Sequence, residues 1–310
     1  MANQIEKLNN IAITSIEKLN GLTDASMEKV NGLEFAGLTQ GAVFRTSSAT
    51  LSTARSRLGG FGGSSDEMVF CGGNNTSATK LTSTETYDRG TTGGSIGSGG
   101  NLNQARFALT AAGTEAAGLC CGGTTASGEA KNSEEYNSNV WSNQAATNTS
   151  GGEFAALAGV QGSAMINGGY VGGYNAESES YNGSTWVTDP PNLGSNQAHG
   201  SASASSADYY RICGGYAGDD GTYNSSYLYT SDSWASSVDM TRTRYVGTLL
   251  GTPDDLVFHS GSGTLTTSDI FDGTSWADGP TPAAGRYAGN NSADCGGTNN
   301  SVSAGGGTGS

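Results

Sequence analysis

The residues best suited to binding a ligand are tyrosines and aspartates in Gly-rich segments near the middle of the chain. They are Tyr170, Tyr174, Tyr216, Asp219, Asp220 and Tyr223. A tyrosine ring can lie under the apolar face of a sugar while nearby carboxylates and amides bond its hydroxyl groups. The pattern indicates a saccharide-binding site, with a tolerated surface insertion as the alternative. The Asp-Asp-Gly sequence is too short for an EF-hand calcium loop.

A second set of candidates is a series of arginines that recur along the chain. They are Arg55, Arg106, Arg244 and Arg286, with Glu153 and His199 at the two remaining places of the series. Four guanidinium groups around a channel mouth could bind a carboxylate or sulfate through paired hydrogen bonds. In the alternative, each arginine locks strand to strand by pairing with a carboxylate such as Glu85, Glu135, Glu179 or Asp269. Residues that recur with a repeat usually build its scaffold, which favours the structural alternative.

The cysteines are Cys71, Cys120, Cys121, Cys213 and Cys295. All but Cys120 share one position of a long repeat, which His259 occupies in another copy. A zinc ion needs its ligands at about 2.0–2.3 Å, whereas equivalent positions of different repeats should lie far apart. The odd number and the spacing give no disulfide framework. We therefore expect the cysteines to be small buried hydrophobes, with no metal and no cofactor.

No constellation of catalytic residues stands out in the sequence. A Ser-His-Asp triad or a pair of opposed carboxylates would be the pattern to expect in a hydrolase. His199 and His259 fall at different positions of different repeats. We therefore predict a protein that is not an enzyme, and a glycan hydrolase is the less favoured alternative.

These candidates must be positioned by a repeat of roughly 42–51 residues. In most copies a short apolar run ends in a Gly pair, and an acidic or polar residue followed by an aromatic residue comes later. In four copies a Trp follows that aromatic by five residues: Tyr136/Trp141, Tyr181/Trp186, Tyr229/Trp234 and Phe271/Trp276. Asn182-Gly183 and Asp272-Gly273 lie between two of these pairs and favour hairpins, so that aromatic and Trp should face each other. Four short strands per copy at this period predict propeller blades.

The Gly pair, the Glu-x-Tyr and the later Trp resemble kelch repeats. The combination of Asn-Gly-Ser-Thr-Trp with Cys-Gly-Gly resembles kelch-like arrays in tail and surface proteins of marine tailed phages. With six copies of the repeat, the resemblance implies an all-β, six-bladed kelch-like β-propeller at residues 41–310. The sixth copy has no fourth strand, so we expect a strand at 42–45 to complete the sixth blade. There are departures from the pattern, because Thr92 stands where the first copy should have Trp and the fifth copy lacks the Gly pair.

Residues 1–40 carry a different repeat, with a period of 11 residues. Its copies are Ile5–Asn9, Ile16–Asn20 and Met27–Asn31, and the last two are followed by Gly-Leu. Asn-Gly after two apolar positions three apart predicts short helical turns stopped by a left-handed Gly. A segment with so few apolar residues cannot form its own core. We predict a helical anchor or oligomerisation segment, and a disordered leader is the alternative.

Composition narrows the function further. The 310 residues include 50 Gly, and the net charge is −14. This charge argues against nucleic acid as a partner, and neither a signal peptide nor an apolar run of about 18 residues is recognisable. With the resemblance, we expect a virion structural protein of a tailed phage, of the tail-fibre or surface-adhesin type. Residues 1–40 would attach it to other virion proteins as a homo-oligomer, and the propeller would bind host-surface glycan or protein. A purely architectural decoration or fibre subunit is the alternative.

Overall fold

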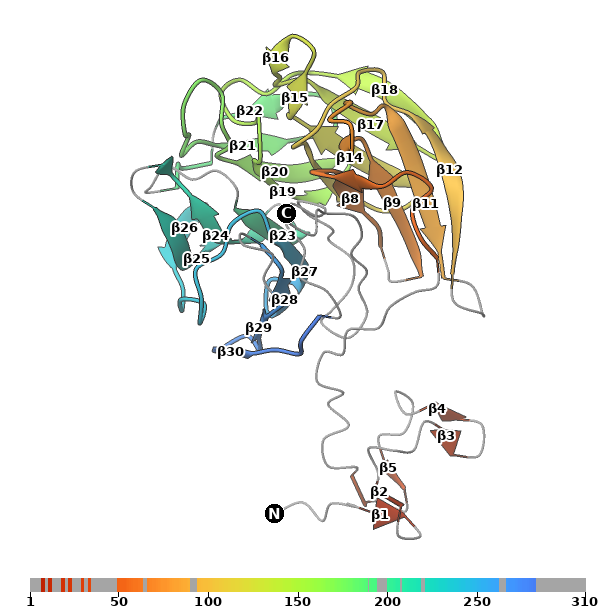
Figure 1. Ribbon diagram of the computed structural model, residues 1–310. Coiled ribbons are helices and arrows are strands. Elements are labelled where there is room, and N and C mark those ends of the chain that lie inside the picture. Colours follow the sequence, from red (N-terminus) through yellow and green to blue (C-terminus); the bar gives the residue numbers. More distant parts are fainter. Residues whose placement is uncertain are drawn as a thin grey trace. The chain divides into compact units, whose positions relative to one another are not determined.

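The computed structural model describes residues 49–282 without 64–65, 90–93, 189, 194–199, 207, 219–220 and 262–265, together with short strands between residues 7 and 34. The chain divides into two compact units, Met1–Val43 and Phe44–Ser310, and the sequence placed the boundary near residue 41. The described residues form β-strands and no α-helix (Figure 1). Among them, no helix is long and apolar enough to cross a membrane.

The described residues of the first unit form three small antiparallel pairs, not the helical turns predicted for this segment. The pairs are β1 (Lys7–Leu8) with β2 (Ile11–Ala12), β3 (Lys18–Leu19) with β4 (Leu22–Thr23), and β5 (Lys29–Val30) with β6 (Leu33–Glu34). In the sequence, the two residues between the paired strands are Asn-Asn or Asn-Gly. Asn-Gly can stop a helix, but it is also the preferred loop of a two-residue hairpin. The 11-residue period is thus a period of strand pairs.

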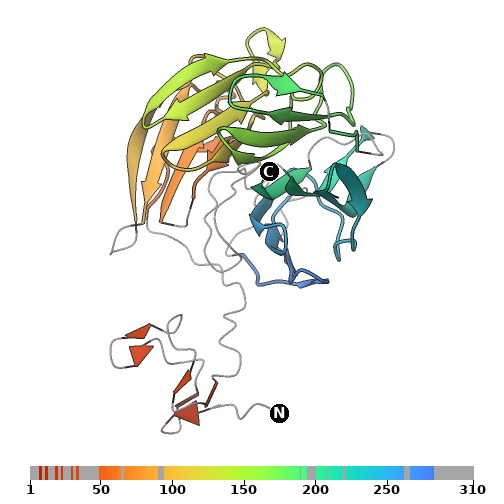
Figure 2. The same ribbon diagram turned by 180° about the vertical axis from the view of Figure 1, so that it is seen from behind.

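The second unit is a β-propeller, of which the structure describes five blades. Each blade is a four-stranded antiparallel sheet, and Figures 1 and 2 show the sheets fanned side by side. Blade 1 contains β8 (Gly59–Phe61), β9 (Glu67–Cys71), β11 (Ser83–Asp88) and β12 (Ser95–Asn101), and blade 2 contains β13 (Thr110–Gly113), β14 (Ala117–Cys121), β17 (Ser133–Asn137) and β18 (Val140–Gln144). Blade 3 contains β19 (Ala156–Val160), β20 (Ser163–Asn167), β21 (Ser178–Tyr181) and β22 (Trp186–Val187). Blade 4 contains β23 (Ser201–Ser206), β24 (Tyr209–Tyr216), β25 (Thr222–Thr230) and β26 (Ser233–Ser236), and blade 5 contains β27 (Thr248–Thr252), β28 (Asp255–His259), β29 (Ser268–Phe271) and β30 (Trp276–Asp278).

The first strand of each blade is the innermost one. Successive first strands β8, β13, β19, β23 and β27 lie against one another, as expected around a central axis. Four further short strands belong to the connections and form two pairs, β7 (Arg55–Ser56) with β10 (Asn74–Asn75) and β15 (Thr124–Thr125) with β16 (Gly128–Glu129). The predicted sixth blade and its completion by residues 42–45 lie outside the described residues.

The predicted hairpins are confirmed in register. Each aromatic residue is directly opposite the Trp five residues later, in the pairs Tyr136–Trp141, Tyr181–Trp186, Tyr229–Trp234 and Phe271–Trp276. Their ring centroids are 4.9–5.2 Å apart. In blade 1 the position opposite Tyr87 belongs to Ile96, so the Trp position is not that of Thr92, which lies outside the described residues.

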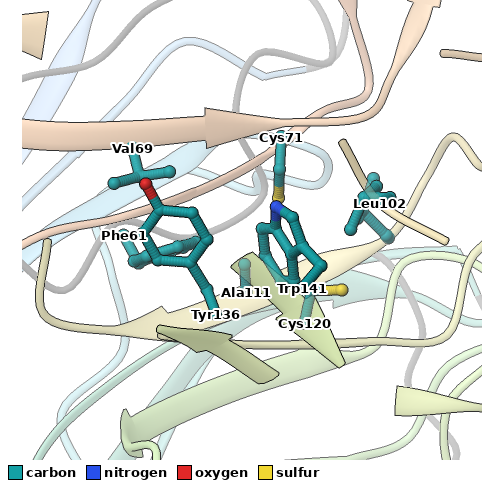
Figure 3. Packing of buried hydrophobic residues seen from close by; sticks show 9 residues of the cluster. Phe61, Val69, Cys71, Leu102, Ala111, Cys120, Tyr136 and Trp141 are labelled. Atoms are coloured by element: carbon teal, nitrogen blue, oxygen red, sulfur yellow. The ribbon is translucent and has the colours of Figure 1, made fainter. Parts of the chain in front are cut away.

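Buried side chains between neighbouring blades form the core. Figure 3 shows the cluster between blades 1 and 2, in which Phe61 lies beside Tyr136 and Trp141. The Trp141 Nε1–H also donates to Thr84 Oγ1 of blade 1 at 3.0 Å, and the equivalent Trp186 donates to Ser133 Oγ of blade 2 at 3.3 Å. Each of these Trp residues therefore joins its blade to the preceding one by both packing and a hydrogen bond.

Candidate ligand-binding face

The connections between blades are fixed by the Gly pairs. The second glycine of a pair donates its N–H to the carbonyl of one residue at the entry of the next blade, which we call the entry residue. These hydrogen bonds are Gly73 to Arg106 at 2.9 Å, Gly123 to Gly152 at 2.6 Å and Gly215 to Arg244 at 2.8 Å. Both glycines of the Gly214-Gly215 pair have positive φ, and a Cβ on Gly214 would lie 2.4 Å from the Arg244 carbonyl oxygen. Ser260-Gly261 takes the place of the pair in blade 5, with φ of 63° and 117°.

This pattern corrects the predicted arginine series in blade 3. The entry residue there is Gly152, which accepts the hydrogen bond that Arg106 and Arg244 accept elsewhere. Glu153, expected at this place, is one residue further on. His199 and Arg286 lie outside the described residues.

The three described arginines of the series are buried in ion pairs. Arg55 Nη2 lies 2.5 Å from Glu85, Arg106 Nη2 lies 2.8 Å from Glu134, and Arg244 Nε lies 2.5 Å from Asp269. Each Nη1 also donates to the carbonyl of the first residue of its blade's Gly pair or its substitute, namely Gly72, Gly122 or Ser260. All three guanidinium groups are fully buried. Their donors serve the scaffold, so Arg55, Arg106 and Arg244 do not form an anion-binding ring.

The partner in blade 2 is Glu134 and not the predicted Glu135. Glu135 instead accepts hydrogen bonds from Tyr181 Oη at 2.9 Å and from Gln144 Nε2 at 3.0 Å. In blade 3, where no arginine is present, Glu179 accepts the backbone N–H groups of residues 148–150 at 2.6–2.8 Å. The carboxylate therefore closes the blade connection with or without an arginine.

The four described cysteines, Cys71, Cys120, Cys121 and Cys213, are buried free thiols. Cys71, Cys121 and Cys213 occupy one register position, each opposite a Ser or Thr, with His259 at the same position in blade 5. Burial raises the pKa of Cys213 to about 12 and also raises the pKa of Cys121. The described residues contain no cluster able to hold a metal ion, and Cys295 lies outside them.

After the Gly pair of each of the described blades 1 to 4, two residues pair across a short antiparallel bridge. The bridged pairs are Asn74–Lys80, Thr124–Glu129, Tyr170–Tyr174 and Tyr216–Thr222. In all four blades the first bridged residue directly follows the Gly pair, whereas the bridged side chains differ in size and charge. We call the surface formed by these bridges and the residues that follow the entry residues the loop face.

The predicted tyrosines Tyr170, Tyr174 and Tyr216 come together on the loop face. The ring centroids of Tyr170 and Tyr174 are 5.2 Å apart, and those of Tyr174 and Tyr216 are 5.7 Å apart. Tyr216 stacks on Tyr245 of blade 5, with 5.3 Å between centroids and 30° between ring planes. All four rings are half-buried, so each keeps part of its surface for a ligand. We call these four residues the tyrosine row.

The other predicted ligand-binding residues are placed differently or not described. Tyr223 follows Thr222 in β25 and, because neighbouring side chains alternate along a strand, is directed to the opposite side from it. Its carbonyl accepts the Arg244 N–H at 3.1 Å. Asp219 and Asp220 lie outside the described residues.

Four of the five described blades each place one residue at the centre of the loop face, where residues of different blades meet. Two positions after the entry residue stand Arg57, Ala108, Phe154 and Val246, all with φ between 49° and 56°. Ala108 donates its N–H to the Arg57 carbonyl at 2.8 Å, and Phe154 donates to the Ala108 carbonyl at 2.9 Å. Ala108, Phe154 and Val246 are buried together, and Phe107 and Tyr245 pack against them. We call this cluster the axial cluster.

Sequence reasoning missed Tyr245, Phe107, Lys80 and Arg57. Tyr245 directly follows Arg244 and Phe107 directly follows Arg106, and no motif sets these two residues apart from the arginine series. The feature that could have identified them is that the residue type at their positions differs from blade to blade. Ser56, Phe107, Glu153 and Tyr245 occupy equivalent places, which shows that the scaffold does not dictate this residue.

The blades and the loop face define this chain as a β-propeller with a candidate binding surface. No family model matches the sequence, and no curated protein matches it. The solved structure titled "Structure of YjhT" is similar, with a TM-score of 0.64 over 77% of this chain and 88% of that chain. The two sequences are 14% identical, so the similarity shows a common fold alone.

Proposed function

We propose that this protein is a virion structural protein of a tailed phage, of the tail-fibre or surface-adhesin type. Its kelch-like propeller binds a glycan of the host surface through the loop face, and residues 1–40 attach it to other virion proteins. The phage assignment is supported by the resemblance of its repeats to kelch-like arrays in such proteins. The tyrosine row is the observation that carries the binding proposal.

The tyrosine row suits a saccharide for three reasons. Its rings come from blades 3, 4 and 5, so they form a surface longer than one residue. Each ring offers an apolar face for the C–H side of a sugar and a hydroxyl group for hydrogen bonding. Cross-blade stacking also holds the rings in place, which lowers the entropy lost on binding.

The proposal is for binding and not for catalysis. The side chains that vary on the loop face are mainly aromatic or hydroxyl-bearing, which suits recognition of neutral hydroxyl groups and ring faces. Single contacts of this kind are weak, and several copies on one particle would add up to useful avidity.

The test is binding of the labelled full chain to host cells and to their extracted surface polysaccharide. We expect saturable binding that free polysaccharide competes away, and a loss of about tenfold or more in affinity for Tyr174→Ala/Tyr216→Ala. The control is Tyr209→Ala, at the opposite end of the same strand β24 as Tyr216. Binding unaffected by the double substitution would remove the tyrosine row from the proposal. No binding by the full chain would favour the architectural alternative.

A further inference from the structure

Two cations of the loop face, Arg57 and Lys80, have no carboxylate partner in the part of the chain that the structure describes. Among the described residues, every arginine except Arg57 forms an ion pair with Asp or Glu. The Arg57 guanidinium lies over the rings of Phe107 and Phe154, with its carbon 5.4 and 5.8 Å from their centroids. Lys80 Nζ lies 5.4 Å from the same Phe107 centroid. A guanidinium stacked on a ring keeps its in-plane N–H groups available to another acceptor.

Both cations depart from the repeat. The residues equivalent to Arg57 are Ala108, Phe154 and Val246, which share its positive φ. The scaffold therefore requires the backbone conformation at this place but no charge. The residues equivalent to Lys80 in the bridges of blades 2, 3 and 4 are Glu129, Tyr174 and Thr222. Two independent positions of blade 1 thus place positive charge at one aromatic ring.

Outside blade 1, the described loop face carries carboxylates and tyrosine rings. Its described carboxylates, Glu129 and Glu153, belong to blades 2 and 3, and Glu153 accepts a hydrogen bond from Thr124 Oγ1. Phe107, which lies beneath both cations, and Tyr245 of the tyrosine row both pack against the axial cluster, so the cluster connects the two regions. A ligand that crosses the axial cluster would meet cations in blade 1 and tyrosine rings in blades 3 to 5.

We propose that Arg57 and Lys80, seated on Phe107, bind the carboxylate or sulfate group of an acidic saccharide. The proposal rests on the proposed function, since it names the substrate class of the same face. Charge-assisted hydrogen bonds from a guanidinium and an ammonium are the interactions that an anionic oxygen prefers. In a protein of net charge −14, a polyanion is repelled by most of the surface, so binding would require a local site such as this one.

The experiment compares matched ligand pairs on the full chain by calorimetry at several salt concentrations. One pair is oligogalacturonate and its methyl ester, and the other is dextran sulfate and dextran. We expect at least one acidic member to bind about tenfold or more tightly than its neutral partner, with a preference that falls as salt rises. Arg57→Gln/Lys80→Gln is expected to abolish this preference, and Arg57→Lys is expected to keep part of it. Circular dichroism checks that each variant retains its strands.

The matched control is Arg89→Gln, which removes one charge from the exposed pair of Arg89 with Asp66 and should leave the preference unchanged. Equal affinity for the acidic and neutral members, or a preference that survives the double substitution, overturns the inference. If neutral host polysaccharide still binds through the tyrosine row in that case, the proposed function stands although the acidic-saccharide inference fails. If acidic ligands bind through Arg57 and Lys80 but host polysaccharide does not bind, the inference stands and the proposed function fails.

Discussion

A buried ion pair closes the connection into blade 2, and it carries the first stability prediction. Arg106 and Glu134 are both fully buried, and Glu134 also accepts the Asn103 N–H at 2.7 Å. Arg106→Met removes the cation and leaves the carboxylate buried without its charge partner. We expect the free energy of unfolding in urea to fall by about 3–5 kcal/mol, because an unpaired buried charge keeps its desolvation penalty.

The exposed pair of Arg89 with Asp66 is the control for this prediction. Arg89→Met should cost no more than about 1 kcal/mol, since both partners are solvated. Glu134→Gln added to Arg106→Met should recover part of the lost stability. If Arg106→Met were as stable as the wild type but lost ligand binding, the result would show that Arg106 has a binding role and not a structural one.

The choice between Glu134 and Glu135 shows what the sequence can and cannot decide at this scale. The repeat correctly predicts that an arginine meets a carboxylate of its blade. Neighbouring residues of a strand point to opposite faces, so a slip of one residue exchanges the two glutamates completely. The carboxylate that closes the blade connection stands two residues before the aromatic in four blades, at Glu85, Glu134, Glu179 and Asp269.

At the scale of elements, the outer hairpins of blades 3 and 5 are close equivalents. Asp272 accepts the N–H groups of Thr274 and Ser275 at 2.9 and 2.8 Å, and Asn182 accepts those of Ser184 and Thr185 at 3.0 and 2.9 Å. The Thr274 hydroxyl adds a further hydrogen bond to Asp272 at 2.8 Å. These hydrogen bonds lower the pKa of Asp272 to about 2, whereas Asn182 does not titrate.

Because the pKa of Asp272 is lower in the folded protein, its carboxylate stabilises the fold above the ordinary pKa of about 4. That contribution is lost as the pH falls toward about 2. We expect wild type to lose stability relative to Asp272→Asn across this range, while the difference between them stays constant from pH 5 to 8. Thermal unfolding of both proteins in a pH series measures this, and a constant difference down to pH 2 would contradict it.

The sequence predicts a secondary-structure element correctly where its local residues are compatible with only one structure. A Trp five residues after an aromatic predicts the outer hairpins, and in blades 3 and 5 an Asn-Gly or Asp-Gly dipeptide between them supports this prediction. The structure has that register. The Asn-Gly dipeptides of residues 1–40 allow two answers, a helix stop and a hairpin loop. The local sequence does not decide between a helix stop and a hairpin loop. In the structure, the described residues there pair as strands.

For the whole molecule, the sequence predicts the propeller but does not predict the loop face, its candidate binding surface. Blades recur because each buries one face against the next, and that requirement leaves a pattern of Gly pairs and aromatics. The loop face forms only when entry residues and bridges from different blades meet. Tyr216 and Tyr245 stack although they belong to blades 4 and 5, and no spacing along the chain encodes that contact.

The same dependence between blades predicts that the described propeller unfolds as one unit. Cys71 and Cys120 lie in the cluster between blades 1 and 2, Cys121 lies between blades 2 and 3, and Cys213 lies between blades 4 and 5. Their thiols are buried, and burial raises the pKa of Cys121 and Cys213. A thiol reagent attacks the exposed thiolate, so none of the four should react in the native protein at pH 8.

The measurement uses Cys295→Ser, which leaves only these four thiols, in increasing urea. We expect all four to become reactive over one transition that coincides with the loss of β-sheet circular dichroism, because opening any blade interface removes packing from both of its blades. Peptide mapping of the labelled cysteines identifies the order of exposure. Labelling of Cys213 at a urea concentration where Cys71 and Cys121 are still protected would show instead that blades 4 and 5 separate independently.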